Sequence, residues 1–223
     1  MGRTPSQDTY LTRQALQRMP YYLQALHRAE REGREFMSAA RMAQELQLNE
    51  VLVRKDIAAV SSTGGRPKAG FPVRCLIQDI EMYMGYHTLK ETILVGAGSL
   101  GQALMKNTEF QMYGISIVAA FDTRRNLIHK TVGSVEIFSM TKLVDFCLKR
   151  NIQIGIITVP PEAAQSVADR MVDGGIRAIW NFALTKLAVP DGVLVQNEDL
   201  ASSLAMLSQH LRLENEMRNS WIE

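Results

Sequence analysis

An α/β fold with a doubly wound parallel sheet, preceded by a smaller helical domain, is predicted by three observations. From residue 91 to residue 196, short apolar runs alternate with helical patterns, as in parallel sheets with crossover helices. The first apolar run leads into a turn with glycines spaced G-x-G-x-x-G. The first 60 residues instead carry apolar side chains at intervals of three and four. We therefore expect three parts, residues 1–85, 86–198 and 199–223.

Three helices are expected in the first part. The first runs from Ser6 to about Arg31, either as one helix or as two joined near Pro20. Ser38 is a good N-cap for the second helix, and the third runs from about Glu50 to Val60. The short break between the second and third helices predicts a helix-turn-helix.

The third helix has two different faces. Val53, Ile57 and Val60 fall on one side, which should face the core. The opposite side carries cations among small apolar groups, which suits the major groove of DNA, where apolar groups meet thymine methyls and cations meet guanine or phosphate. A helix covered by the protein's own neighbours is the alternative. The residues of this outer face are Val51, Lys55 and Ala58, flanked by Leu52 and Arg54.

A glycine-rich loop, residues 61–71, follows the third helix and contains Arg66 and Lys68 but no acid. Together with the helices it predicts a winged helix-turn-helix, whose two loop cations could reach the DNA backbone or a minor groove. A flexible linker is the alternative. Residues 1–90 hold 13 Lys and Arg against 9 Asp and Glu, net +4, and the remainder holds 12 against 14, net −2. The residues expected to contact double-stranded DNA are Ser38, Val51, Arg54, Lys55, Ala58, Arg66 and Lys68.

The glycine turn predicts a dinucleotide-binding Rossmann domain. Gly96 would make the tight turn, Gly98 would let a pyrophosphate approach the backbone, and Gly101 would let the helix pack closely on its strand. The phosphates would lie at the helix N-terminus. The next strand ends in Asp122, about 20 residues after the last glycine, where an acid accepts the ribose hydroxyls. A glycine turn that only joins strand to helix is the alternative.

The carboxyl ends of the other strands should meet the same cofactor, because ligands of such sheets bind there. Asp122 favours NAD(H), since its charge would repel a 2′-phosphate. Arg124 and Arg125 leave an alternative open, because an arginine beside the acid can accommodate that phosphate. The residues expected to bind NAD(H) are Gly96, Ala97, Gly98, Ser99, Leu100, Gly101, Asp122, Arg124, Thr158, Val159, Pro160, Asn181 and Phe182.

Composition excludes several classes of protein. There is no run of 18 apolar residues and no apolar leader, so we expect a cytoplasmic protein without a membrane partner. Cys75 and Cys147 lack a metal-ligand spacing, so neither a disulfide framework nor a metal site is expected. The last helix, from about Asp199 to Met217, carries a leucine stripe that could cover its own sheet or a second subunit.

Taken together, the motifs resemble the Rex family of redox-sensing bacterial transcriptional repressors over about residues 10–215. The resemblance implies a homodimer that binds an operator with two winged helices and reads the NADH/NAD ratio with two Rossmann domains, NADH releasing the DNA. It also implies a C-terminal helix exchanged between subunits and a cofactor role for Asp199. The motifs are Val53-Arg54-Lys55-Asp56, the turn from Gly96 to Gly101, Ala119-Ala120-Phe121-Asp122, the segment from Val159 to Gln165, and Asn181-Phe182-Ala183.

The sequence departs from the family pattern at three positions. Phe71 stands where the wing usually ends in tyrosine, Leu52 where glutamine is frequent, and Gln24 where the first helix can carry an arginine that relays the nicotinamide state. A regulator that keeps the cofactor without responding to its redox state is therefore one alternative. A small NAD-dependent dehydrogenase is the other, and Tyr86 and Lys90 do have its Y-x-x-x-K spacing, although before the glycine turn. We expect a regulator without catalytic residues.

Overall fold

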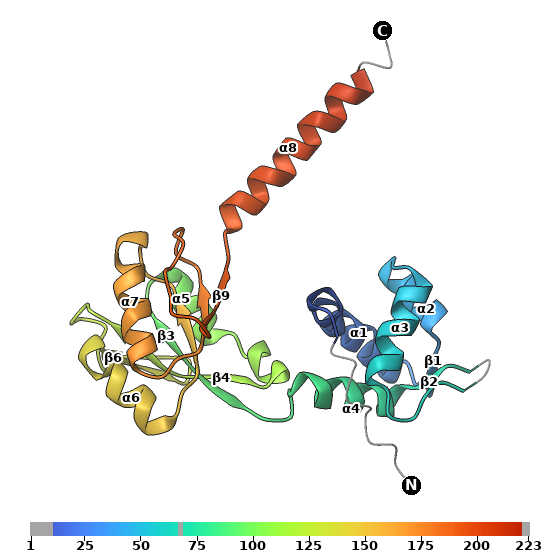
Figure 1. Cartoon of the computed structure of the whole chain (residues 1–223), viewed down its shortest axis with the longest axis horizontal. Helices are drawn as coiled ribbons and strands as arrows, with labels where there is room; N and C mark the ends of the chain where they lie inside the picture. Colours follow the sequence, from blue (N-terminus) through green and yellow to red (C-terminus); the bar gives the residue numbers. More distant parts are fainter. Residues whose placement is uncertain (1–10, 67–68, 220–223) are drawn as a thin grey trace. The chain divides into compact units, whose positions relative to one another are not determined.

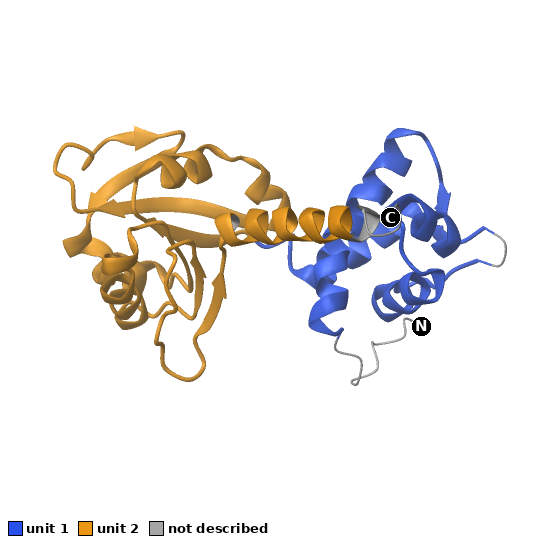
Figure 2. Ribbon diagram, turned by 90° about the horizontal axis from the view of Figure 1, so that it is seen from above, with its two compact units in different colours: residues 1–88 blue, residues 89–223 orange. Residues whose placement is uncertain are grey.

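The computed structural model of the chain describes residues 11–66 and 69–219. The chain divides into two compact units between Thr88 and Leu89 (Figure 2), and the last helix is grouped with the second unit. Of the DNA-binding candidates, Lys68 lies outside the described residues, as does the expected helix start at Ser6.

The described residues of the first unit form four helices and a two-stranded sheet (Figure 1). The sheet pairs β1 with β2 in antiparallel register, with Phe36 opposite Pro72 and Met37 opposite Phe71. A core of apolar side chains from all four helices holds the unit together, including Met19, Leu26, Met42, Ile57 and Leu76. The elements are α1 (Arg13–Arg31), β1 (Phe36–Met37), α2 (Ala39–Leu46), α3 (Glu50–Val60), β2 (Phe71–Pro72) and α4 (Val73–Met84).

The helix-turn-helix has the limits that the sequence predicts. The Ser38 hydroxyl accepts a hydrogen bond from the Arg41 N–H and caps α2. Gln47, in the left-handed conformation with φ of 54°, ends that helix. The Asn49 side chain then accepts from the N–H groups of the first turn of α3. The expected helix around Pro20 is one continuous helix, α1.

A buried polar cluster joins α1 to α3. The Asp56 carboxylate accepts a 2.8 Å hydrogen bond from the Tyr22 hydroxyl and another, also 2.8 Å, from the Arg18 guanidinium. Asp56 and Tyr22 are both buried, so the cluster satisfies polar groups that water cannot reach. These bonds fix the rotation of α3 relative to α1.

The second unit contains a seven-stranded sheet with the order β5-β6-β4-β3-β7-β8-β9. Every pair is parallel except β5 with β6. The chain enters the sheet at β3, adds β4 and β6 on one side of it, and then adds β7, β8 and β9 on the other side. This order confirms the doubly wound Rossmann arrangement. The strands are β3 (Lys90–Val95), β4 (Ile115–Asp122), β5 (Thr131–Val132), β6 (Val135–Ser139), β7 (Ile154–Ile157), β8 (Ala178–Asn181) and β9 (Leu194–Asn197).

Helices cover both faces of this sheet. Leu143 and Cys147 of α6 and Met171 of α7 pack on one face, and Met105 of α5 packs on the other. Leu148 lies four residues after Val144 and so falls on the same side of the helical wheel, a pattern that would predict burial, yet it is exposed. No helix of the described chain is long and apolar enough to cross a membrane. The helices are α5 (Ser99–Lys106), η1 (Glu109–Tyr113), η2 (Met140–Lys142), α6 (Leu143–Arg150), α7 (Pro161–Asp173) and α8 (Leu200–Asn219).

Candidate nucleotide-binding and DNA-binding sites

A cavity of about 640 Å³ lies at the carboxyl ends of β3, β4 and β7, where the strand order reverses. Doubly wound sheets bind their ligands at this switch point. Of the predicted cofactor residues, the cavity brings together Gly96, Gly98, Asp122, Arg124, Thr158, Val159 and Pro160.

The three glycines of the turn are required for different reasons. Gly96 has φ of +103°, and a Cβ on Gly101 would lie 2.0 Å from the Gly96 carbonyl oxygen, so the fold itself needs both. Gly98 has φ of −73°, and a Cβ there would meet nothing within 4 Å. Neither backbone strain nor packing therefore explains a glycine at position 98.

The helix that starts at this turn offers donors to an anion. Gly98 is the N-cap residue of α5, and no side chain caps this helix end. The first N–H groups of a helix have no partner within it, and the helix dipole adds partial positive charge. Because Gly98 faces open space within the cavity, a phosphate could approach these N–H groups closely.

Thr158 holds the loop after β7 against the glycine turn. Its hydroxyl lies 2.7 Å from the Gly96 carbonyl oxygen and 3.1 Å from that of Val95. The Thr158 N–H donates to the Val95 carbonyl as well. These bonds place Val159 and Pro160 along the cavity wall.

Asp122 occupies the position expected for a ribose-binding acid at the end of β4. One carboxylate oxygen accepts from the Ala97 N–H at 2.8 Å and from the Arg124 guanidinium at 2.7 Å. The other accepts from the Arg124 N–H at 2.9 Å and from its Nε at 3.0 Å. Burial opposes ionisation of Asp122, but the bonds from Arg124 and Ala97 outweigh burial and lower the pKa of Asp122.

Several predicted cofactor residues lie outside the cavity lining. Asn181 is buried, and its amide holds the turn after β8 by donating to the Ala183 and Thr185 carbonyls. Phe182 packs against Trp180, with ring centroids 4.5 Å apart. Asp199 is exposed and accepts a hydrogen bond from the Ser202 N–H at the start of α8. Ala97, Ser99, Leu100 and Gly101 belong to the glycine turn and α5.

The sequence prediction missed the apolar part of the cavity. Val95 and Phe121 are the last apolar residues of their strands, and both line it. The residues of α7 that line the cavity are three or four positions apart, a helical spacing that could have indicated which side of α7 faces the cavity. These residues of α7 are Ala163, Ser166, Val167 and Arg170.

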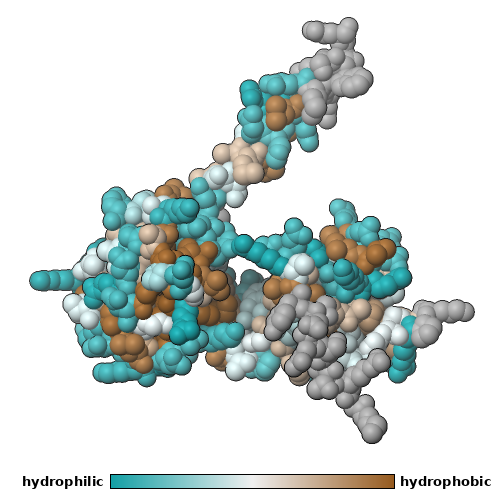
Figure 3. Space-filling model, viewed as in Figure 1, coloured by the Kyte–Doolittle hydropathy of each residue, from teal (hydrophilic) through white to brown (hydrophobic). Residues whose placement is uncertain are grey.

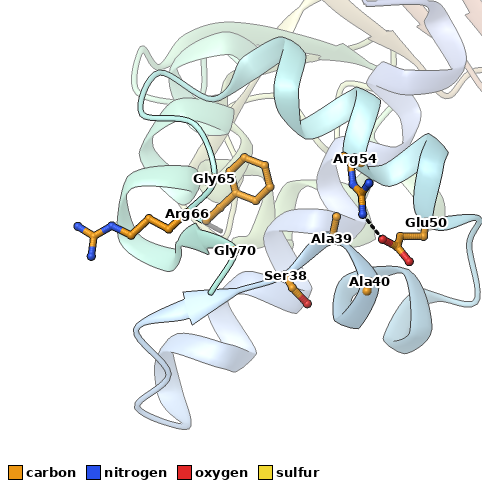
Figure 4. A pocket seen from close by; sticks show the side chains of 9 residues that line it. Ser38, Ala39, Ala40, Glu50, Arg54, Gly65, Arg66 and Gly70 are labelled. Atoms are coloured by element: carbon orange, nitrogen blue, oxygen red, sulfur yellow. Dashed lines mark hydrogen bonds and ion pairs between the residues drawn. The ribbon is translucent and has the colours of Figure 1, made fainter. Parts of the chain in front are cut away.

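A second cavity, of about 450 Å³, lies between the helix-turn-helix and the wing (Figure 4). It brings together three of the predicted DNA contacts, Ser38, Arg54 and Arg66. The Arg54 side chain turns toward Glu50, with which it forms an ion pair, and Arg66 extends away from the cavity (Figure 4). The guanidinium of Arg66 lies 5.0 Å from the Phe36 ring centroid.

The other predicted contacts follow the exposed side of α3. Val51 is 73% exposed, and Lys55 and Ala58 are exposed as well. Val53 and Ile57 on the opposite side are buried in the core of the unit. Within the described residues of the first unit, no neighbouring element covers this side of α3.

The wing has a defined base. Arg66 and Gly70 exchange backbone hydrogen bonds of 2.7 and 3.0 Å. Gly70 has φ of +95°, and a Cβ there would lie 2.4 Å from the Met37 carbonyl oxygen. Phe71 is buried, and a Cβ on Gly65 would lie 3.2 Å from its ring, so the described part of the loop is folded onto the unit rather than extended as a linker.

A winged helix-turn-helix unit joined to a dinucleotide-type parallel sheet defines a class of protein, the transcriptional regulators that carry a nucleotide-binding domain. Comparison with known proteins agrees with both halves. The family model "Putative DNA-binding protein N-terminus" matches residues 11–58, and the model "CoA binding domain" matches residues 87–185.

Relatives match over almost the whole chain. The redox-sensing transcriptional repressor Rex of Treponema denticola is 40% identical over 193 residues, which are 86% of this chain and 91% of that protein. Rex of Porphyromonas gingivalis is 32% identical over 205 residues, 92% of this chain and 94% of that protein. This chain belongs to the Rex family of redox-sensing transcriptional repressors.

Solved structures of a Rex-family repressor, RSP, have the same fold. RSP in complex with NAD⁺ and operator DNA matches with a TM-score of 0.87 at 29% identity, covering 97% of this chain and 99% of RSP. RSP in complex with NADH matches with a TM-score of 0.82 at 30% identity, covering 95% and 99%.

Proposed function

We propose that this protein is a transcriptional repressor that binds double-stranded operator DNA and senses the NADH/NAD⁺ ratio, with NADH releasing it from the operator. The main observation in favour of nucleotide binding is Gly98, which lines the cavity at a position where the fold does not require glycine. A ligand whose phosphates approach the backbone there explains it. Relatives that are named redox-sensing repressors support the regulatory half.

The residues of the cavity fit a dinucleotide. Its phosphates would be held at Gly98 and the first turn of α5, and its adenosine ribose beside Asp122. Val159 and Ala163, which line the cavity and are partly exposed, would provide an apolar surface for the adenine. The predicted cofactor roles of Asn181 and Phe182 remain proposals.

The cofactor supplies the signal through the charge of its nicotinamide ring, which is positive when oxidised and neutral when reduced. A charged ring favours a solvated surrounding, and a neutral ring tolerates a closed apolar one. The protein can respond only if its DNA-competent and DNA-released conformations bind the two forms with different affinity.

The DNA side would use α3 and the wing. Lys55 and Arg54 would meet base edges or phosphates, with Val51 and Ala58 against thymine methyls. The Ser38 hydroxyl accepts the Arg41 N–H, so its own hydrogen is available to donate to a phosphate. Arg66 would reach the backbone or a minor groove from the wing.

We further propose a homodimer that acts in the cytoplasm, where its operator would be. The apolar residues of α8 support this proposal, because Leu204, Met206, Leu207 and Leu211 are 60–68% exposed. Figure 3 shows apolar side chains at the surface of this helix. Such a helix face is stabilised by burial against a second copy. Exchange of α8 between subunits, and a role of Asp199 toward the cofactor there, belong to the same proposal.

The test is a binding experiment on the purified protein. A DNA site selected from a random pool is labelled, and its affinity is measured by fluorescence anisotropy without cofactor, with NAD⁺ and with NADH. We expect tight binding with NAD⁺ and release by NADH. Equal affinity in all three conditions would refute the sensor, and turnover of a hydroxy acid with NAD⁺ would point to a dehydrogenase instead.

A further inference from the structure

An acid lies among the cations on the exposed side of α3. Glu50 is the first residue of this helix, and its carboxylate forms an ion pair with the guanidinium of Arg54, one turn further on (Figure 4). Both side chains are accessible, with exposed fractions of 44% for Glu50 and 65% for Arg54. Both also line the cavity between the helix-turn-helix and the wing, together with Ser38 and Arg66. Glu50 therefore belongs to the surface that the proposed function assigns to DNA.

The two other acids of α2 and α3 are occupied away from this surface. Asp56 is buried in the polar cluster that joins α1 to α3. Glu45 forms ion pairs with Arg34 and Arg41 and is not among the residues that line the cavity. An acid in the first turn and an exposed ion pair four residues apart each stabilise a helix only slightly. Folding therefore places little demand on an acid at Glu50.

A carboxylate at this position has two opposite effects on DNA binding. It repels phosphates and compensates the charge of Arg54, so it lowers the affinity for DNA of any sequence. It can also accept a hydrogen bond from the amino group of cytosine, whereas guanine presents acceptors that suit Arg54. A DNA site with a cytosine within reach of Glu50 therefore offsets the repulsion, and other sites do not. A penalty on wrong partners is a general means of specificity.

We propose that Glu50 is a specificity-determining residue, which accepts a hydrogen bond from a cytosine amino group while Arg54 beside it donates to guanine. This inference rests on the proposed function, because it concerns the DNA-facing side of α3. The ion pair restrains Arg54 from binding phosphates of any sequence. It opens where the base edges provide a partner for each of the two side chains.

The test compares the wild type with Glu50→Gln, which keeps the size of the side chain and removes its charge. Preferred sites are selected from a random pool, and the affinities for the wild-type site and for random-sequence DNA are measured by fluorescence anisotropy without cofactor. One base contact is worth about 5- to 150-fold, so the ratio of the two affinities should fall by about that factor. Selection should change one position from cytosine to adenine, which glutamine prefers. The salt dependence of log K on random DNA should steepen by about one unit, because Arg54 becomes free for a phosphate.

Asp145→Asn is the matched control, because it removes the same charge from the first turn of α6 in the second unit, and it should leave the ratio unchanged. Glu50→Ala removes the acceptor without offering a new one, so its ratio should fall and no preference for adenine should appear. Partial unfolding would weaken binding to both DNAs alike, so the ratio separates specificity from stability. A selective wild type with the same ratio and the same preferred bases in Glu50→Gln would overturn this inference alone. A wild type that binds selected and random DNA equally would overturn the proposed function as well.

Discussion

At the scale of single residues, two glycines of the same turn are present for different reasons, one because the fold requires it and the other because a ligand would. Packing requires glycine at position 101, because a Cβ there would lie 2.0 Å from the Gly96 carbonyl oxygen. At position 98 a Cβ would meet no atom within 4 Å, and the backbone φ of −73° is one that any residue adopts. The sequence spacing alone cannot make this distinction, because both glycines belong to the same motif.

Replacing Gly98 by valine should leave the fold intact and block the cofactor. The new side chain would occupy the space where a phosphate must approach, so NADH affinity should fall by more than about 100-fold, while DNA binding without cofactor persists. Fluorescence titration measures the NADH affinity, circular dichroism checks the fold, and fluorescence anisotropy measures the DNA binding. Normal NADH uptake by a folded Gly98→Val variant would contradict the assigned turn.

Gly101→Ala is the informative comparison. Its methyl group would meet the Gly96 carbonyl, so we expect a loss of stability of about 1–3 kcal/mol in thermal or chemical unfolding. A fully stable Gly101→Ala protein would show that the strand and helix do not approach as closely as the structure has them.

The buried cluster of α1 and α3 predicts a stability change at high pH. Burial, followed by the hydrogen bond to Asp56, raises the pKa of Tyr22 from its ordinary value of 10 to about 12. The folded state therefore favours the neutral phenol, so this contribution is complete below pH 10 and is lost between about pH 10 and pH 12. The loss should be about 1–3 kcal/mol, from roughly 1.4 kcal/mol per pKa unit.

Chemical unfolding of the wild type and of Tyr22→Phe at several pH values from 9 to 12 measures this contribution. The variant lacks the titrating hydroxyl, so its stability should fall less steeply in this interval. Identical pH profiles for the two proteins would contradict a buried, hydrogen-bonded Tyr22.

At the scale of elements, α3 has the burial that its sequence pattern predicts. Val53 and Ile57 are buried, and the cations Arg54 and Lys55 are exposed. The pairing of Arg54 with Glu50 could not be inferred from the hydrophobic pattern. When Arg54 contacts DNA, it must therefore break its ion pair with Glu50 or keep Glu50 as a second partner.

Replacing Lys55 or Arg54 by alanine should weaken DNA binding and spare NADH affinity. Loss of a base contact costs about 1–3 kcal/mol, and loss of a phosphate contact lowers the salt dependence of log K by about one unit. Lys149→Ala, at an exposed cation of α6, is the control and should not change DNA affinity. Wild-type operator affinity in both α3 variants would remove α3 from the DNA interface.

The long elements were predictable from sequence, and the short ones were not. The limits of α2 and α3 follow from their N-caps, Ser38 and Asn49, which are local signals. The strands β1, β2 and β5 have two residues each, and β1 pairs with a partner far along the chain, so periodicity could not reveal them. The exposed Leu148 shows the same limit, because the helical wheel does not specify how wide a face the sheet covers.

The site was predictable at strand ends and unpredictable where helices meet them. Gly96, Asp122 and Val159 converge because parallel strands end at one edge. The approach of α7 to that edge depends on packing across the unit. The hydrogen bonds that the Arg124 guanidinium donates to Asp122 depend on side-chain geometry, which residue spacing cannot give.

At the scale of the whole molecule, the apolar face of α8 predicts that dimerisation depends on it. Leu207→Glu would place a charge among residues that a partner should cover, and loss of one buried leucine alone removes about 1.5–3 kcal/mol. We expect light scattering to show a shift from dimer to monomer at micromolar concentration.

Gln209→Glu adds the same charge at a polar position of the same helix, so it should leave the dimer intact. A monomeric wild type, or a Leu207→Glu variant that stays fully dimeric, would contradict the role proposed for α8.

The central claim is a coupling between the cavity of the sheet and the cationic face of α3. Coupling between two binding sites is reciprocal, so each ligand must change the affinity of the other by the same factor, typically about 5- to 150-fold. Operator affinity is measured with and without saturating NADH, and NADH affinity with and without saturating operator, on the same protein. We predict that both affinities fall by one common factor; two affinities that do not change would contradict the claim.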